Sequence, residues 1–449
     1  MEMLKNKYIT FINSLYYPVF IALLVLIGHT FSLELFSAIT LLTTVGLGLI
    51  FCCDLKFLVS PLFMFIFIFS QKSVEGGKFY SKPYIIAMIS VGLALIGLFV
   101  FHFIYYRKSL DIKALSKSRL LIGILALSAS FLLNGFLNFK NYSIQNITFA
   151  IIIVVSLALV FFIFQVNYKA NEKSKDYLFF VLYLTSIVLT LELLLSFVHQ
   201  IKLENGEILK ESILLGWGMW NNIGGMLAFL LPSHFYFATT AKRFGYVFYF
   251  TGVLSYVATV LTLSRSSLLT ASLIIAISII CSCCMGNNKK FNRIISLTLL
   301  CAGILFATVF FSKISAVLND FLQRGFNDNG RFNIYRHGLE SFLENPIFGN
   351  GFASDYKLEY EFVKFLPFRY HNTIIQIMAG CGSVGLISYL YHRYTTAKLL
   401  IEKKSLFSLF SGLCIVSLLL CSLLDNHFFN IYPLFIYSVI LVVNEKATS

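Results

Sequence analysis

Charged residues are scarce in this sequence: only 12% of its 449 residues are Asp, Glu, Lys or Arg, whereas 58% are hydrophobic. A water-soluble domain of this length does not have that balance. Apolar runs of about 18 to 24 residues recur along the whole chain, and a helix needs roughly 20 such residues to cross a bilayer. The sequence therefore predicts an all-α, polytopic integral membrane protein.

Three further absences exclude kinds of chemistry. None of the nine cysteines lies between residues 313 and 370, the longest polar interruption, which argues against an extracellular disulfide framework. The predicted outer segments hold no Asp-x-Asp pair and no carboxylate cluster, so neither a divalent-metal site nor any cofactor is expected. No glycine-rich phosphate loop follows a strand, so a soluble nucleotide donor is not expected either.

The net charge of +14 is dispersed among short loops, so it does not indicate nucleic-acid binding. Alternate loops carry most of the basic residues, as the positive-inside rule requires of cytoplasmic loops. We therefore expect a membrane protein with both termini cytoplasmic and a first span that is retained as a signal anchor. About 12–14 transmembrane helices are expected, in the segments 14–31, 33–53, 57–70, 84–106, 119–138, 147–167, 177–198, 218–240, 246–263, 265–286, 294–312, 371–391, 406–424 and 431–444.

Residues 313–370 form a long loop that this topology places outside the cytoplasm. Apolar residues recur at helical spacing from Arg331 to Asn345, and the stretch NPIFGNGF then interrupts the pattern with one proline and two glycines. A second helix is predicted over 354–366, after a Ser-Asp cap. Two amphipathic helices on the outer surface would form a cap over the bundle.

Two arginines in this region are candidates for binding an anion. Arg265 lies in TLSRSS at the outer tip between two predicted spans, and Arg331 opens the first loop helix, where free backbone N–H groups favour anions. The sequence fits two other interpretations equally well. Arg265 would then be an interfacial arginine that contacts lipid headgroups, and Arg331 would be a solvated charge in a loop. Arg324 and Arg336 are weaker candidates in the same loop.

His371 opens the next span on the outer side. Imidazole titrates near neutral pH, so a histidine there can accept a proton, although it can equally be an interfacial residue. Asn372 follows it and is a candidate for fixing its tautomer or holding a ligand. Asp425 lies at the outer tip of the last pair of spans, and Asn221 is a candidate for lining the same cavity.

Several motifs taken together resemble the O-antigen ligase and O-antigen polymerase family of bacterial membrane glycosyltransferases, which are similar to the GT-C type. They are TLSRSS at a span tip, GRFNIYRHGLESFLENPIFGNGF in a long outer loop and HNTIIQIMAGCGSVGLI at the start of the next span, preceded by GWGMWNNIGGMLAFLLP. The resemblance covers residues 216–424, which we expect to be the catalytic region. Residues 1–215 would be an N-terminal transmembrane bundle, and residues 425–449 the last helix and a cytoplasmic tail.

The resemblance implies roles for particular residues. Arg265 and Arg331 would engage the diphosphate of an undecaprenyl-diphosphate-linked glycan donor, and His371 would act on the acceptor hydroxyl as a base or an orienting group. Asp425 matches the family pattern more loosely. Transfer would be metal-independent and inverting, to a glycan or lipid-linked acceptor, with O-antigen, capsule or exopolysaccharide as the product. The resemblance also implies a location in the bacterial inner (cytoplasmic) membrane, with a flippase and a chain-length regulator as partners.

An alternative interpretation from another functional class, a transporter, remains open. A lipid-linked oligosaccharide flippase or another polysaccharide transporter would also have many spans. It predicts charges along a central path and short loops, whereas this sequence has few charges in its spans and one long loop. Polymerase and ligase are not separated by the sequence, because both use the same donor and differ in the acceptor.

Overall fold

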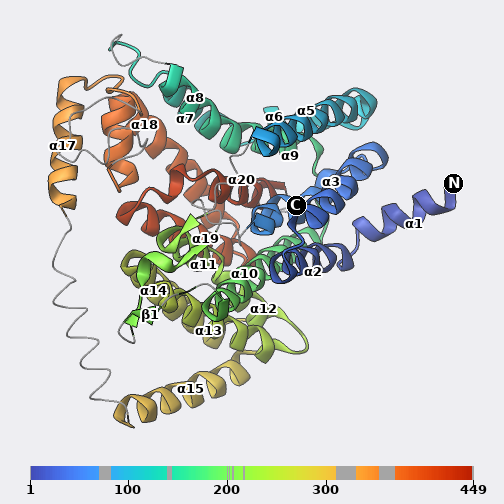
Figure 1. The fold of residues 1–449 in the computed structure, drawn as a ribbon, viewed down its shortest axis with the longest axis vertical. Coiled ribbons are helices and arrows are strands. Elements are labelled where there is room, and N and C mark those ends of the chain that lie inside the picture. The colour runs from blue at the N-terminus through green and yellow to red at the C-terminus, as the bar shows by residue number, and fades with distance from the viewer. Residues whose placement is uncertain are drawn as a thin grey trace.

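The computed structural model describes residues 2–69, 82–138, 144–199, 201, 203–204, 207–215, 218–309, 330–352 and 370–446. Its helices follow one another along the chain (Figure 1). They are α1 (Glu2–Ile12), α2 (Tyr16–Phe31), α3 (Glu34–Phe51), η1 (Leu55–Leu58), α4 (Val59–Met64), η2 (Phe65–Phe69), α5 (Lys82–Tyr105), η4 (Arg107–Ser109), α6 (Ile112–Ser116), α7 (Leu121–Leu132), α8 (Ile144–Val154), η5 (Val155–Leu159), α9 (Val160–Asn167), α10 (Ser174–His199), η6 (Lys210–Ser212), α11 (Trp220–Leu230), α12 (Pro232–Thr240), α13 (Gly245–Leu261), α14 (Arg265–Cys284), α15 (Lys289–Val309), α17 (Arg331–Glu344), α18 (Thr373–Glu402), α19 (Leu406–Leu424), η8 (His427–Phe429) and α20 (Ile431–Lys446).

The described strands are four two-residue segments that form two small antiparallel hairpins before α11. They are β1 (Leu203–Glu204), β2 (Glu207–Ile208), β3 (Leu214–Leu215) and β4 (Gly218–Met219). The prediction of an all-α polytopic membrane protein is therefore confirmed. A helix satisfies its own backbone hydrogen bonds, which is why a chain this apolar forms helices rather than open sheets.

Six described helical segments are long and apolar enough to cross a membrane. They are α3, the continuous α8–η5–α9 unit, α10, α14, α18 and α19. The pair α1 and α2, bent by 79° at their junction, would make a seventh. Each of the fourteen predicted segments overlaps helix, but several helices are short or broken. The total of 12–14 spans stays a prediction.

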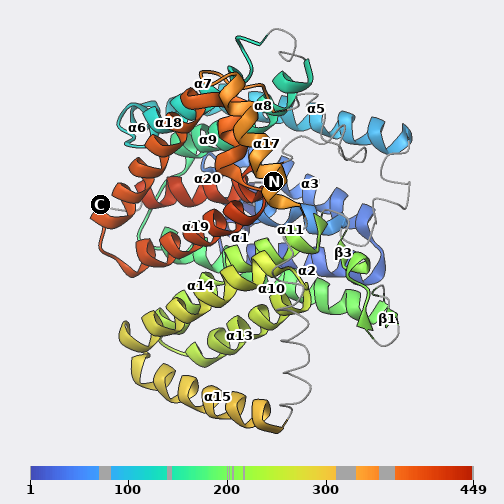
Figure 2. The same ribbon diagram turned by 90° about the vertical axis from the view of Figure 1, so that its left-hand side faces the viewer.

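The helices α10, α11, α12, α13, α14 and α19 form one bundle, in which they pack on one another. The buried helix α20 packs on α10 and α19 of this bundle and on α9 and η5, while α7 packs on α18. Figures 1 and 2 show α17 lying beside α18 at the edge of the molecule. All nine cysteines are free, in keeping with their positions in apolar runs.

The helix α18 is broken at Gly382, whose φ of 64° and ψ of −157° are not helical. The NPIFGNGF loop docks its backbone into this break. Asn350 and Gly351 donate their backbone N–H groups to the carbonyl oxygens of Ala379 and Gly380, at 2.7 and 3.0 Å. The helix resumes with Ser383 donating to the Pro346 carbonyl at 2.7 Å. The loop and the broken helix thus satisfy each other's free backbone groups.

The first loop helix was predicted from Arg331 to Asn345, and α17 matches it. Its face against α18 is centred on Gly338, where an added Cβ would lie 2.3 Å from the Ile375 side chain. Phe332 and Leu343 of the same helix are exposed. The second loop helix predicted over 354–366 lies outside the described residues.

Candidate functional site

His371 is held at the junction between the long loop and α18. Its φ of 45° is left-handed, a conformation that non-glycine residues seldom adopt and that often marks functional sites. Asn372 caps α18, because its side-chain oxygen accepts hydrogen bonds from the backbone N–H groups of Ile374 and Ile375. The Asn372 amide also donates to the carbonyl of Leu423 at 2.9 Å. The cap therefore ties the start of α18 to the end of α19.

This tie places His371 against Asp425, which ends α19. The Nδ1 atom of His371 lies 3.0 Å from Oδ1 of Asp425. The histidine side chain is 46% exposed, whereas the aspartate side chain is only 16% exposed. The Nδ1 edge of the imidazole is thus held by a largely buried carboxylate, while the rest of the ring remains accessible.

Asp425 is ionised in this setting. Burial by itself would raise the pKa of the carboxyl group, but the hydrogen bond from His371, the nearby imidazole of His427 and the backbone N–H of Asn426 outweigh it. The pKa of Asp425 is consequently below its ordinary value. An ionised acceptor at Nδ1 favours the tautomer with the proton on Nδ1, which leaves the lone pair on Nε2 of His371 free to accept another proton.

A hydrogen-bond chain links this His–Asp pair to the turn that carries Arg265. Asn221, in the first turn of α11, donates to the second carboxylate oxygen of Asp425 at 3.1 Å. Ser264 donates to the side-chain oxygen of Asn221 at 2.8 Å, and its hydroxyl lies 2.9 Å from that of Ser267. Arg265, the first residue of α14, follows Ser264 directly and is half-buried.

The loop helix α17 packs against the residue that precedes His371, since an added Cβ at Gly338 would lie 2.9 Å from the Tyr370 ring. Tyr335 has a raised pKa, mainly because of burial and also because of Asp425, while Arg331 acts in the opposite direction. Both charges therefore lie close enough to the phenol to influence it. Arg331 is the first residue of α17 and is half-buried.

The other candidates have different surroundings. Arg336 is 80% exposed and pairs with Glu340 at 2.9 Å on the solvent side of α17. Arg324 lies outside the described residues. Within the described ranges, no three His, Cys, Asp or Glu side chains are grouped as a metal site requires. Metal independence stays a prediction.

The structure adds Tyr335, Ser264 and Ser267 to the surroundings of the site. The sequence offered one signal for the two serines, since small polar residues flank Arg265 in an otherwise apolar stretch. It offered none for Tyr335, which belongs to the apolar stripe of its helix. The arrangement combines an oriented imidazole with two arginines, each the first residue of a helix. An imidazole can take a proton from a hydroxyl group, and guanidinium groups can stabilise a departing anion.

One comparison with known proteins identifies a related family. Residues 250–390 match a family model described as O-antigen ligase, which covers α14, α17, most of α18 and His371. None of the curated proteins matches the chain. The match confirms the family resemblance, and together with the apolar helices it indicates a bacterial membrane protein. It also supports a glycosyltransferase activity on polysaccharide.

Proposed function

We propose, on the premise that residues 250–390 are an O-antigen ligase domain, that this protein transfers a glycan from undecaprenyl diphosphate to a sugar hydroxyl at the outer face of the cytoplasmic membrane. The observation that carries the proposal is the His371–Asp425 pair at 3.0 Å, which hydrogen bonds through Asn221 and Ser264 connect to the turn that bears Arg265. The product is a surface polysaccharide: O-antigen, capsule or exopolysaccharide.

The histidine acts on the acceptor. Asp425 keeps the proton on Nδ1 of His371, so Nε2 takes the proton from the attacking sugar hydroxyl. The hydroxyl oxygen forms a bond to the anomeric carbon as that carbon loses its bond to the diphosphate oxygen. One displacement inverts the anomeric configuration, and the imidazolium later returns its proton to water.

The arginines act on the donor. As the glycosidic bond breaks, the bonding electron pair leaves with the diphosphate, which gains negative charge. Guanidinium groups stabilise that charge and bind phosphate oxygens in a bidentate manner. Both arginines lie at helix N-termini, where the helix dipole adds a favourable field for an anion.

The acceptor determines which of two related reactions occurs. A polymerase adds the glycan to a lipid-linked repeat unit, whereas a ligase moves the finished chain to another glycolipid. Both reactions need the same donor site and the same base, so we propose the shared chemistry. Incubating the purified protein with a lipid-linked repeat unit alone would separate them, because only a polymerase lengthens it.

The arginines provide the test. In purified protein supplied with an undecaprenyl-diphosphate-linked glycan, Arg265→Ala and Arg331→Ala should each reduce transfer at least about a hundredfold, the usual effect of losing one charge-stabilising donor. Arg→Lys should restore little of it, because an ammonium lacks the planar fork. Arg243→Ala is the matched control, since Arg243 is an exposed arginine in the α12–α13 loop. Normal transfer by either site variant would remove that arginine from the mechanism.

A further inference from the structure

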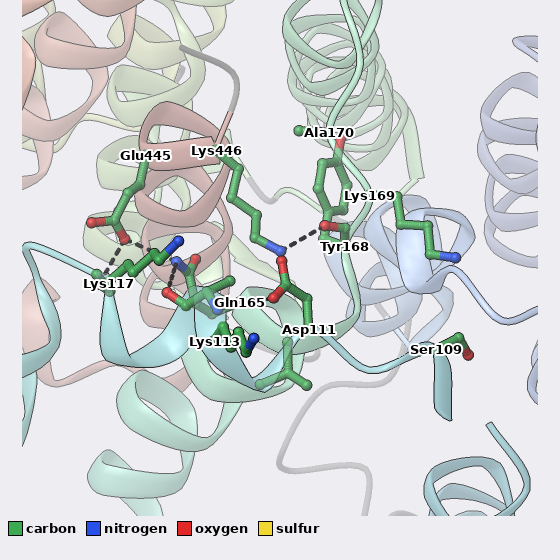
Figure 3. Close-up of a pocket in the computed structure, with 13 residues that line it drawn as sticks. Ser109, Asp111, Lys113, Lys117, Gln165, Tyr168, Lys169, Ala170, Glu445 and Lys446 are labelled. Atoms are coloured by element: carbon green, nitrogen blue, oxygen red, sulfur yellow. Dashed lines mark hydrogen bonds between the residues drawn. The ribbon is translucent and has the colours of Figure 1, made fainter. Parts of the chain in front are cut away.

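A polar cavity lies among segments that carry none of the candidate-site residues. The helix α20 begins close to Asp425 and ends at Lys446, which lines a cavity of about 590 Å³ (Figure 3). The other walls come from the segment around α6 and from the end of α9. Its volume is within the range of small-molecule sites, about 300–1,000 Å³.

The two carboxylates of this cavity already have partners in the protein. Glu445 accepts hydrogen bonds from the Ser118 hydroxyl at 2.7 Å and from the Gln165 amide at 3.2 Å. Figure 3 shows Asp111 pointing toward the Lys446 ammonium, which donates to the Tyr168 carbonyl at 2.8 Å. Asp111 also accepts a hydrogen bond from the backbone N–H of Ala114 at 3.0 Å. Both carboxylates and the Lys446 ammonium therefore have hydrogen-bond partners within the protein.

Three other lysines leave the cavity with an excess of positive charge. Lys113, Lys117 and Lys169 line it and are exposed, and none of them forms an ion pair within the described part of the chain. Lys113 and Lys117 are four residues apart in and after α6, so they lie on the same side of that helical turn. The cavity therefore attracts an anion.

The position of the cavity favours an anion that belongs to the membrane. It lies where α9 and α20 end, and α9 completes a helical segment that is long and apolar enough to cross a membrane. Lipid headgroups are found near the ends of such segments. Ile112, next to Lys113, is exposed, and the apolar side chains of Ala114 and Val166 line the cavity beside the lysines. The charge asymmetry of the sequence predicts this side to be cytoplasmic, and basic pockets between helices on that side bind anionic headgroups.

We propose that this cavity is a binding site for the phosphate of an anionic membrane lipid. Lys113 and Lys117 hold the phosphate, and the apolar side chains of Ala114 and Val166 contact the first carbons of the acyl chains. The site is separate from the proposed glycan transfer and does not depend on it.

Native mass spectrometry of the full-length protein tests the site. The protein is released from nanodiscs that contain equal amounts of phosphatidylglycerol and phosphatidylcholine, and the retained lipids are counted. Wild-type protein should keep phosphatidylglycerol selectively. The double variant Lys113→Gln with Lys117→Gln should bind it about tenfold or more weakly, because each lysine near a membrane surface contributes about a factor of five to anionic-lipid binding. Both side chains are exposed, so packing and melting temperature should not change.

The matched control is Lys289→Gln with Lys290→Gln, two exposed lysines at the start of α15 on the same predicted side of the membrane. This control changes the net charge equally but should keep the lipid. Equal loss in both double variants, or no loss in either, would overturn the proposal. Displacement of phosphatidylglycerol by millimolar inorganic phosphate would also overturn it, by showing that the cavity takes a soluble anion.

Discussion

At the scale of single residues, the carboxylate of Asp425 determines which nitrogen of His371 accepts a proton. The aspartate receives hydrogen bonds on both oxygens, from His371 and from Asn221. It is therefore fixed in position as well as ionised. In the proposed reaction, this fixed anion would orient the imidazole and stabilise the imidazolium that forms when the acceptor is deprotonated.

We predict that His371 and Asp425 act as one unit in catalysis. His371→Gln and Asp425→Asn should each lower turnover about 10²–10⁴-fold, the usual contribution of general acid–base catalysis. The double variant should be no worse than the more damaged single variant, because residues that act together do not contribute additively. Single-turnover kinetics with a lipid-linked donor would measure this.

The control for this prediction is another His–carboxylate pair of the same chain. His337 lies 3.2 Å from Glu340 on the exposed side of α17, so Glu340→Gln removes a histidine partner away from the site. It should leave turnover within about twofold of wild type, as an exposed pair contributes little. If the double variant of His371 and Asp425 instead loses turnover by the product of the two single losses, the two residues have separate roles.

The sequence identified both residues of the pair but not the pair itself. His371 was marked by its position at the start of a span and Asp425 by its position at the tip of another, each from a local pattern. They are 54 residues apart, and their contact depends on the Asn372 cap that ties α18 to α19. The sequence predicts that Asn372 orients the histidine directly or holds a ligand. In the structure its side-chain nitrogen donates to the Leu423 carbonyl and its side-chain oxygen accepts from the Ile374 N–H.

At the scale of elements, the break in α18 is the feature that holds the long loop in place. An added Cβ at Gly382 would lie 2.3 Å from the carbonyl oxygen of Ile347. At Gly349 it would lie 2.4 Å from the backbone of Gly380. Glycine is thus required on both sides of the contact, for its backbone conformation and for the close approach of two chains.

We predict that Gly382→Ala destabilises the protein by roughly 1–3 kcal/mol, because alanine is strained in this conformation and collides with the docked loop. Melting temperature in detergent would report the loss. Gly92→Ala is the control: Gly92 is inside α5 with open space around its Cα, so alanine should be neutral or stabilise by roughly 0.5–1 kcal/mol. Equal melting temperatures for the two variants would contradict a tightly docked loop.

The helix α17 shows where periodicity works and where it fails. Its bounds followed from a local apolar pattern and a following Pro-Gly interruption. The face of α17 that packs on the protein did not follow from that pattern. It is centred on the small residues Gly338 and Ser341, whereas the large apolar residues Phe332 and Leu343 are exposed. In membrane-associated helices small residues allow close contact and large apolar ones can face lipid, so hydrophobicity does not identify the protein-facing side.

At the scale of the whole molecule, the class of fold follows directly from hydropathy, but the number of spans does not. The segment predicted over 218–240 is divided into α11 and α12 at Pro232, and the long α18 combines a short helix and a longer one around Gly382. Breaks of this kind depend on partners elsewhere in the fold. Sliding-window patterns detect the apolar segment but not the bend within it.

The orientation of the molecule in the membrane decides whether the proposed chemistry is possible. In the predicted topology α17 faces outward, so that the His–Asp pair meets acceptor sugars outside the cytoplasm, while the turn between α14 and α15 faces inward. Asn333 in α17 and Asn287 in the turn are both exposed asparagines. A cysteine at either position is therefore accessible to a maleimide on whichever side of the membrane it lies.

We predict that a membrane-impermeant maleimide labels Asn333→Cys in intact spheroplasts and labels Asn287→Cys only after permeabilisation. The exposed native cysteines Cys284 and Cys301 are first replaced by serine, so that the introduced thiols give the signal. The transfer activity of each cysteine variant is measured before the maleimide is added, and normal activity verifies that the fold is intact. Labelling of Asn333→Cys only after permeabilisation would place Arg331 and His371 in the cytoplasm, and transfer at the outer face would then be excluded, whatever the chemistry of the pair.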